Sequence, residues 1–336
     1  MLVLIMLNCI NESIPMGRSY DYGYNISISD CIFTRSQQYN SYGGVIALVN
    51  CNIGLYISDS IFKRCIIGNN NLGGCIFLKE YKKSVFMVKR SCAYNCSSNR
   101  EHFCHVEQID SGSSYLYDFS SLFCAFEKEG RSVLSFGVGI KEFNRDNISN
   151  SRSFNDCQLL LLYKGVATVT NCIFSNGISN HSACFYIFSV NSVIYYTAFV
   201  NNSIEKGCVF LFGYASIIIE NSYLFSNFGP IFNATNGDVK FNACYIDHQF
   251  EIPHIKYIAL SNITYKSTQL PSISFFSSLH CAPTKEVIPK SNFPFIYVLF
   301  GLILVLLSGF SIKVFIKQRK LINTYESFQL VDSEFG

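Results

Sequence analysis

The sequence predicts an all-β protein: a parallel β-helix ectodomain, followed by one C-terminal transmembrane α-helix. Two observations lead to this prediction. Between residues 13 and 290, short runs rich in Ile, Val, Phe, Tyr and Ser recur at intervals of about 20 to 30 residues, and residues 293–312 form an apolar stretch without charge. Periods of this length are typical of stacked repeats, and such a stretch is typical of a membrane span.

Each repeat begins with an apolar pair, a polar residue and Cys or Ser, and ends at an anchor that is usually aromatic. ISISDCIF, LYISDSIF and TVTNCIF are clear copies. A second motif follows most anchors about ten residues later, as in GGVI from Gly43 and GGCI from Gly73. The predicted anchors are Phe33, Phe62, Tyr94, Phe123, Phe154, Phe174, Phe199, Phe225 and Ile246.

Three short strands and three bends need about this many residues, so one repeat matches one coil of a β-helix. Stacking then places Phe and Ile in the interior, small Cys and Ser near the bends, and Asn or Gly at the corners. About nine coils would form a rod of roughly 40 Å. The alternative is two antiparallel sandwich domains, which also consist of short strands and turns.

The composition excludes a disordered chain and argues against a nucleic-acid-binding protein. The chain has 336 residues, of which 49% are hydrophobic and 15% charged, with 31 Phe and 21 Tyr. Such a chain must bury apolar surface and is not disordered. Its formal net charge of +3 argues against a nucleic-acid partner held by phosphate contacts.

Residues 293–312 would make a helix of about 30 Å, the thickness of the hydrocarbon layer. A buried core helix is the alternative. Lys313, Lys317, Arg319 and Lys320 follow the stretch, and the positive-inside rule places them in the cytosol. We therefore expect a plasma-membrane protein with an extracellular domain at residues 13–290 and a cytoplasmic tail at residues 313–336.

Glycosylation sequons and cysteines agree with this orientation. All 15 Cys precede the span, and so do all sequons, beginning with one at Asn11. Sequons in a translocated chain are candidate glycan acceptors. The candidates in the ectodomain are Asn25, Asn95, Asn147, Asn180, Asn201, Asn233 and Asn262.

The first residues allow two interpretations. Met1–Leu7 is apolar but has no preceding Lys or Arg, whereas a signal peptide normally has a basic region before its apolar core. Residues 1–12 are either a short or truncated signal peptide or the first buried strand.

The repeats resemble those of polymorphic membrane proteins, whose paired motifs read GG[AIV][ILV] and FxxN. GGVI and GGCI match the first, and Phe199–Asn202 matches the second. The resemblance covers roughly residues 24–250 and implies a right-handed parallel β-helix on a cell surface, with adhesion as its role. Similar Asn-, Cys- and Tyr-rich repeat proteins with one C-terminal helix occur in trichomonad parasites. Bacterial members end in a translocating barrel, whereas this chain ends in the predicted helix.

Many β-helices are polysaccharide lyases or hydrolases, and glycoside hydrolysis needs paired carboxylates. Asp30 and Asp59 occupy equivalent places in adjacent repeats and would stack about 5 Å apart, although both are also suited to cap a bend. The following repeats have Arg90, Ser120 and Arg152 near that place, so no acidic cleft continues. We predict no catalytic residue and no cofactor.

The cysteines allow three roles. Cys92, Cys96, Cys104 and His105 are potential zinc ligands, but their spacing matches no established finger pattern. A disulfide among the three cysteines is the alternative. Most other cysteines fall at repeated positions and are expected to be buried thiols, so we predict no metal site.

The tail contains Tyr325 and Phe328 in a tyrosine-x-x-hydrophobic pattern. It resembles internalisation signals that clathrin adaptors bind, and an extended peptide of this kind docks by strand addition. An inert tail is the alternative.

We therefore predict a single-pass type I surface protein that mediates adhesion to, or recognition of, host cells or glycans. A membrane-tethered carbohydrate-active β-helix is one alternative, and a decayed family copy without function is another.

Overall fold

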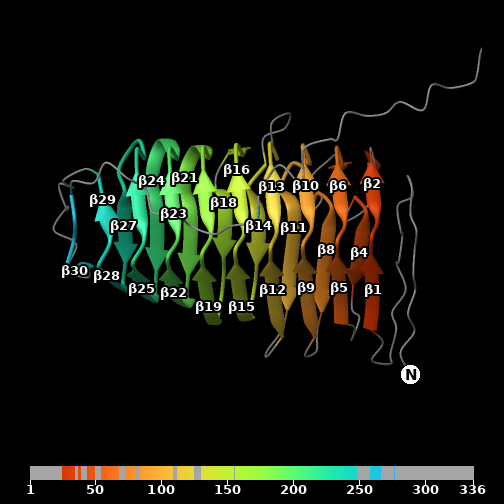
Figure 1. Ribbon diagram of the computed structural model, residues 1–336, viewed down its shortest axis with the longest axis horizontal. Coiled ribbons are helices and arrows are strands. Elements are labelled where there is room, and N and C mark those ends of the chain that lie inside the picture. Colours follow the sequence, from red (N-terminus) through yellow and green to blue (C-terminus); the bar gives the residue numbers. More distant parts are fainter. Residues whose placement is uncertain are drawn as a thin grey trace, which may run out of the picture. The chain divides into compact units, whose positions relative to one another are not determined.

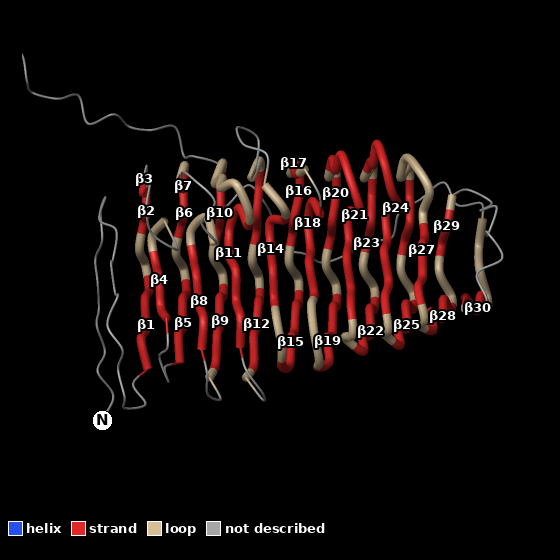
Figure 2. Tube along the Cα trace, turned by 180° about the vertical axis from the view of Figure 1, so that it is seen from behind, coloured by secondary structure: helices blue, strands red, loops and turns tan. Residues whose placement is uncertain are grey.

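A computed structural model shows a stack of coils built from parallel strands (Figures 1 and 2). It describes residues 25–34, 37–38, 44–49, 54–67, 73–80, 84–108, 112–124, 130–154, 156–247, 258–265 and 276. These residues form strands and turns and no helix. The predicted parallel β-solenoid is confirmed, and the antiparallel alternative is excluded for this part of the chain.

The first sheet has ten strands, one from each successive coil. All its pairs are parallel, with each strand bonded to its equivalent in the next coil. The strands are β1 (Asn25–Ser29), β5 (Gly54–Ser58), β9 (Val85–Lys89), β12 (Ser113–Tyr117), β15 (Gly139–Asn144), β19 (Gly165–Thr170), β22 (Asn191–Tyr195), β25 (Ser216–Glu220), β28 (Asp238–Asn242) and β30 (Ile258–Ser261).

The second sheet has nine short strands, each following a first-sheet strand after one bend. They are β2 (Ile32–Thr34), β6 (Ile61–Lys63), β10 (Cys92–Tyr94), β13 (Ser120–Leu122), β16 (Asn147–Ser149), β20 (Ile173–Ser175), β23 (Ala198–Val200), β26 (Tyr223–Phe225) and β29 (Tyr245–Ile246).

The third sheet closes the coil. It contains β4 (Ile46–Val49), β8 (Ile76–Glu80), β11 (Glu101–Gln108), β14 (Ser132–Phe136), β18 (Asp156–Leu161), β21 (Ile178–Phe188), β24 (Ser203–Gly213) and β27 (Phe232–Thr235), with β17 (Arg152–Ser153) beside β21. A small separate sheet pairs β3 (Gln37–Gln38) with β7 (Ile66–Ile67).

Aromatic rings stacked from coil to coil fill the interior. Phe33 lies 4.9 Å from Phe62 between ring centroids, and Phe174 lies 5.5 Å from Phe199. All four are buried anchors in equivalent positions of the second sheet. The strands alternate in burial, so one face of each sheet forms the core, as expected for period-two side chains.

Four predicted anchors are out of register. The interior positions belong to Ala93, Ser121, Ile148 and Leu224, not to Tyr94, Phe123, Phe154 and Phe225. A shift of one residue turns a side chain to the opposite face, and Tyr94 and Phe225 accordingly face outward and are half-buried. Aromatic residues alone do not align the repeats correctly. The interior position of the second sheet also accepts small residues, because a ring from another sheet fills the space there.

The corners adopt the left-handed backbone that Asn and Gly favour, although residues other than these hold most of the corners after first-sheet strands. Each first-sheet strand is followed by a residue with positive φ, such as Asp30 at 55° and Asn171 at 54°. Gly74 is also required, because a Cβ there would collide with the carbonyl of His102. A glycine at this corner lets two coils approach closely.

The predicted terminal segments lie outside the described residues. These are the leader at residues 1–12, the span at residues 293–312 and the tail at residues 313–336. Among the described residues, we find no helix with the length and apolarity that crossing a membrane requires.

Replacing Phe199 with Ala should strongly destabilise the solenoid. Its ring is 1% exposed and lies within 5.5 Å of the rings of Phe174, Phe185 and Phe210, so the cavity should cost about 3–5 kcal/mol. Phe225→Ala, on the outward face, is the matched control and should cost about 1 kcal/mol or less. Urea unfolding measures both, and equal losses would contradict this register.

Candidate functional site

The outward side of the first sheet is a surface that extends over all ten strands of that sheet. We call it the outer face; its side chains point away from the core in two columns, and none of them is buried. The columns are Ser27, Tyr56, Met87, Tyr115, Glu142, Thr168, Val193, Ile218, Lys240 and Ala259, and Ser29, Ser58, Lys89, Tyr117, Asn144, Thr170, Tyr195, Glu220, Asn242 and Ser261.

Three tyrosines lie within the first four strands of the outer face. The Tyr115 and Tyr117 rings lie 5.9 Å apart, and Tyr56 stands in the same column as Tyr115, two coils away. Partial burial raises the pKa of Tyr117, and the hydrogen bond to Glu142 raises it further. The Tyr117 phenol therefore stays neutral, and each of the three tyrosines offers both an apolar ring and a polar tip.

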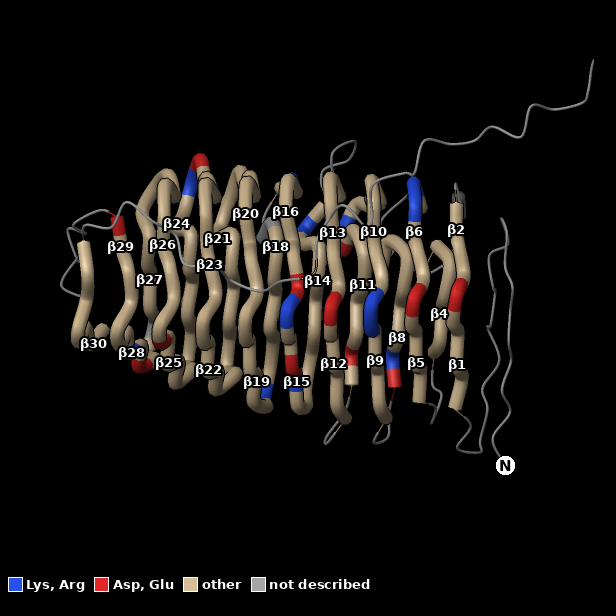
Figure 3. Tube along the Cα trace, viewed as in Figure 1, with Lys and Arg blue, Asp and Glu red and all other residues tan. Residues whose placement is uncertain are grey.

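A row of charged residues borders the outer face at the bend before the second sheet (Figure 3). The two Arg90 nitrogens each lie 2.6 Å from a carboxylate oxygen of Asp59, and Arg145 Nε lies 3.0 Å from Asp118 Oδ1. From Asp59 to Arg145, successive coils thus present opposite charges, which attract each other through this part of the stack.

This charged row bears on whether Asp30 and Asp59 form a catalytic carboxylate pair or cap a bend. Both sit at the predicted bend positions of adjacent coils, with φ of 55° and 49°. Hydrogen bonding from Arg90 lowers the pKa of the Asp59 carboxyl. A general acid needs a raised pKa, so Asp59 is poorly suited to protonate a leaving group.

The predicted glycan acceptors differ in accessibility. Asn25, Asn201, Asn233 and Asn262 are exposed, and Asn95 and Asn180 are half-buried. Asn147 is only 5% exposed, so a glycan on it would be incompatible with this packing. Of these residues, only Asn25 belongs to a first-sheet strand. The tail candidates Tyr325 and Phe328 lie outside the described residues.

The residues considered as zinc ligands do not form a cluster. Cys96 lies at an inner corner position and Cys104 in the third sheet. His105 faces the opposite side of that strand and stacks on Phe77 with ring centroids 5.6 Å apart. Cys92 begins β10 and is disulfide-bonded.

The prediction of a disulfide among Cys92, Cys96 and Cys104 is wrong. Cys96 and Cys104 are free thiols, so the partner of Cys92 is a different cysteine. The three residues are close in sequence but belong to three different positions of the coil, because the chain turns a corner between each pair.

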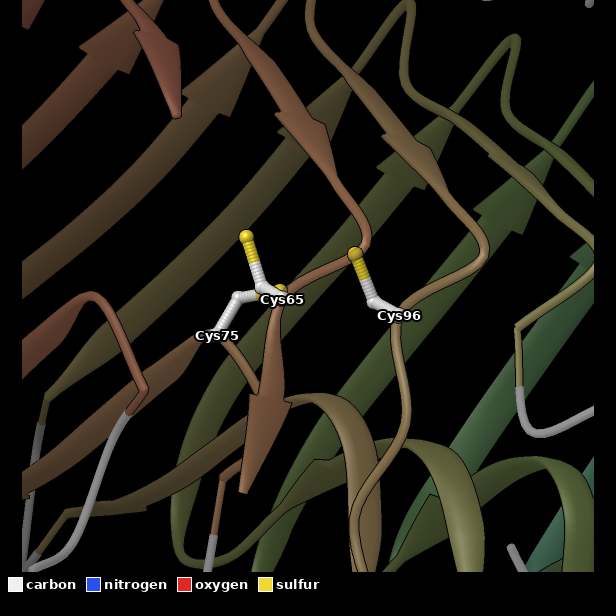
Figure 4. Close-up of side chains that lie close together, drawn as sticks. All are labelled: Cys65, Cys75 and Cys96. Atoms are coloured by element: carbon white, nitrogen blue, oxygen red, sulfur yellow. The ribbon is translucent and has the colours of Figure 1, made fainter. Parts of the chain in front are cut away.

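A different set of thiols meets in the interior (Figure 4). The sulfur atoms of Cys65, Cys75 and Cys96 all lie within 4.8 Å of one another. Cys65 and Cys96 occupy equivalent corners of adjacent coils. Cys75 immediately precedes β8 of the third sheet. The sequence analysis does not find this cluster because it places an anchor at Tyr94. Counted from Phe62 and Ala93, both corner cysteines lie three residues later.

These thiols favour packing over metal binding. The Cys96 Sγ donates to the Phe62 carbonyl at 3.4 Å and to the Tyr94 carbonyl at 3.6 Å. Burial, with smaller effects from its two thiol neighbours, raises the pKa of Cys75. A soft metal ion would need thiolates, whereas burial and hydrogen bonding both favour the protonated form here. The cluster therefore behaves as small hydrophobic side chains.

Two buried ionisable groups also lie inside the coils. The Lys141 Nζ donates to the Gly139 carbonyl at 3.1 Å, and burial lowers its pKa to about 8. Asp146 accepts a hydrogen bond from the Phe119 amide at 2.8 Å, and burial raises its pKa. Lys141 lies in an inward-facing column of the first sheet, and Asp146 lies in the bend that follows this sheet. Both are beneath the outer face.

No family model, curated protein or solved structure matches the chain. The resemblance to polymorphic membrane proteins therefore stays a prediction.

Thiol titration should confirm the cysteine assignment. Ten described cysteines are buried thiols, so denatured and unreduced protein should release at least that many reactive thiols per chain. Dithionitrobenzoate, with prior reduction as the reference, gives the number. Fewer than two thiols would overturn the packing role of the cysteine columns.

The stability of the fold should depend on His102 in acid. Burial lowers the pKa of His102 from 6.5 to about 3, so only the unfolded chain binds the proton between these values. The contribution of neutral His102 to the free energy of unfolding is therefore fully present above pH 6.5. It is lost as pH falls below this value, by up to about 1.4 kcal/mol per pH unit.

Urea unfolding of wild type and His102→Asn from pH 7 to 4.5 tests this. Asn retains a side-chain acceptor for the Ser98 amide, which bonds His102 Nδ1. Asp146 titrates in the opposite sense, so the measured quantity is the difference between the two proteins. The wild-type advantage should shrink with falling pH, and a constant difference would contradict the assignment.

Proposed function

We propose that the chain is a single-pass type I surface protein whose solenoid mediates adhesion to, or recognition of, host cells or glycans. The observation that carries this proposal is the outer face, a long, repeated surface that is rich in Ser, Thr, Asn and Tyr. Residues 293–312 would anchor it in the plasma membrane, with residues 313–336 in the cytosol.

Three features of the outer face suit recognition. Its side chains are held in fixed columns by parallel pairing, so little conformational entropy is lost on binding. Tyr56, Tyr115 and Tyr117 supply large amphipathic contact area, which is enriched at binding sites. The candidate glycan acceptors lie at corners, at the sheet's ends or on other sheets, and so leave its centre accessible.

We also propose that the coil is right-handed. Connections between parallel strands of one sheet follow this hand in nearly all proteins because of strand twist, and the resemblance to polymorphic membrane proteins implies the same.

A carbohydrate-active enzyme is less well supported. Catalysis of glycoside hydrolysis requires one protonated and one ionised carboxyl. Asp59 is paired with Arg90, and Asp118 is paired with Arg145. Recognition needs no such pair.

Binding by the full-length protein on the surface of expressing cells tests the function. Replacing both Tyr115 and Tyr117 with Ser should reduce binding to host cells or to a glycan array by about tenfold or more, the loss expected for central aromatic contacts. Tyr94→Ser, on the second sheet, is the control and should leave binding unchanged. Equal binding by all three proteins would refute the assigned face.

Antibody staining of intact cells tests the orientation. A tag after residue 24 should be stained without permeabilisation, and a tag at residue 336 only after it. The reverse pattern, or extraction of the protein by alkaline carbonate, would contradict the proposed anchor.

The tail should direct internalisation if it is used as an adaptor signal. Tyr325→Ala removes the aromatic anchor and should lengthen the time that the protein stays at the surface, and Phe328→Ala should do the same. Antibody-uptake assays measure this, with Tyr325→Phe as a size-matched control. Unchanged uptake in both alanine variants would indicate an inert tail.

A further inference from the structure

The corner between the third and first sheets exposes two tyrosines in one column. β18, β21 and β24 are neighbours in the third sheet (Figure 2). By the register of these strands, Tyr163, Ser189 and Tyr214 hold equivalent positions at the corner that follows them. Tyr163 is 54% exposed and Tyr214 is 57% exposed. Two exposed rings are therefore separated by one coil, in which a small residue takes the same position.

The fold does not require tyrosine at this corner. Tyr163 and Tyr214 have φ of 68° and 51°, in the left-handed region where a side chain with a Cβ has a steric cost. Ser189 and Asn236 hold the same corner of neighbouring coils at 57° and 51°. An exposed ring gains little packing in return for this cost, and backbone strain of this kind concentrates at functional sites.

Phe188 orients the Tyr214 ring. The two ring centroids lie 5.4 Å apart at an interplanar angle of 75°, which is a favourable edge-to-face geometry. Gly213 makes room for this contact, because a Cβ there would lie 2.6 Å from Phe188 Cδ2. The Tyr214 ring is thus positioned by its neighbour while most of it stays accessible.

The surroundings of the two tyrosines are apolar or polar, with little charge. Val166 lies near the start of β19, three residues after Tyr163, and is 49% exposed. Asn191 is exposed near Ser189, and its Oδ1 accepts a 3.1 Å hydrogen bond from the Ser216 amide. Across residues 162–166, 188–191 and 213–216, Lys164 is the one charged residue. A ligand at this corner therefore meets aromatic faces with uncharged polar groups between them.

A neutral glycan has the matching chemistry. A pyranose with equatorial hydroxyls exposes faces of C–H groups, whose partial positive charge suits the negative face of an aromatic ring. In an extended β-linked chain, each sugar is turned over relative to the previous one, so alternate sugars present the same face to one side. Two coil steps separate Tyr163 from Tyr214, which is about 10 Å and close to the length of two such sugars.

We propose that Tyr163 and Tyr214 form a binding site for a neutral, extended, β-linked oligosaccharide. The oligosaccharide runs along the stack and places alternate sugars on the two rings, with the sugar between them over Ser189. The site is separate from Tyr115 and Tyr117, which belong to β12 of the outer face. The inference rests on the proposed function, since it names a ligand class for a recognition protein.

Oligosaccharides of two lengths test the spacing. The probes are the disaccharide and the tetrasaccharide of β-linked glucose and of β-linked N-acetylglucosamine. Titration calorimetry of the full-length protein in detergent measures their affinities. Because only the tetrasaccharide reaches both rings, it should bind at least about tenfold more tightly than the disaccharide in one of the two series. Equal affinity at both lengths, or no binding in either series, would overturn the site.

Substitutions of the two tyrosines test which rings are used. Ser189 holds this corner at positive φ, so serine is compatible with the backbone there. Tyr163→Ser and Tyr214→Ser should each lower the affinity for the tetrasaccharide about tenfold. Tyr163→Phe retains the ring and should retain the affinity. Wild-type affinity in both serine variants, or an equal loss in Tyr163→Phe, would refute stacking on these rings.

Tyr196→Ser is the matched control. Tyr196 is 53% exposed with φ of 47°, but it follows β22 at a different corner, where the adjacent coils have Asn171 and Asn221. The control should bind the tetrasaccharide as the wild type does. A tenfold loss in this variant would show that any exposed corner tyrosine contributes, which contradicts a site built from one column.

These outcomes are separable from those for the proposed function. If the protein bound host cells through Tyr115 and Tyr117 but bound neither oligosaccharide series, the corner site alone would be wrong. If the oligosaccharides bound at the corner while the outer-face variant still bound cells normally, the corner site would stand and the assigned outer face would be wrong.

Discussion

In each coil, the residue immediately after the first-sheet strand must adopt a left-handed backbone conformation. The rest of the fold depends on this conformation. The position is held by Asp59, Arg90, Tyr196 and Ala243 alike, with φ between 45° and 51°. Non-glycine residues pay a steric cost there. The neighbouring coil compensates, because the same residue's amide donates to its strand, as Arg90 does to Tyr117 at 2.9 Å. Side chains at this corner are therefore free to vary, whereas the backbone is not.

The next residue, which points inward, is constrained differently. In the first corner it is Ser60 or Ser91, whose hydroxyl accepts a hydrogen bond from the equivalent amide in the preceding coil. In the second corner the column changes from Cys65 and Cys96 to Asn202 and Asn227, and each amide side chain again bonds a carbonyl of an earlier coil. The thiol, hydroxyl and amide side chains all do the same thing: each points inward at a corner and forms a hydrogen bond with the backbone of another coil. The cysteine content of this chain thus reflects the interior more than a covalent framework.

Much of this could be predicted from the sequence, because the period and the apolar runs are local properties. Phe33, Phe62, Phe174 and Phe199 were placed correctly, since each belongs to a clear copy of the motif. Register failed at Tyr94 and Phe123, because spacing between equivalent residues changes from 31 between Ser60 and Ser91 to 25 between Thr197 and Ser222. The thiol cluster could not be predicted without that register.

The stacking of strands by parallel pairing has a mechanical consequence. A force on the final coil would peel β30 from β28 one bond at a time, whereas a force across the stack, applied to a strand in the middle of the first sheet, would be shared by the strands on both sides of it. A contact held by the middle of this sheet would therefore resist shear without unravelling the stack from its end.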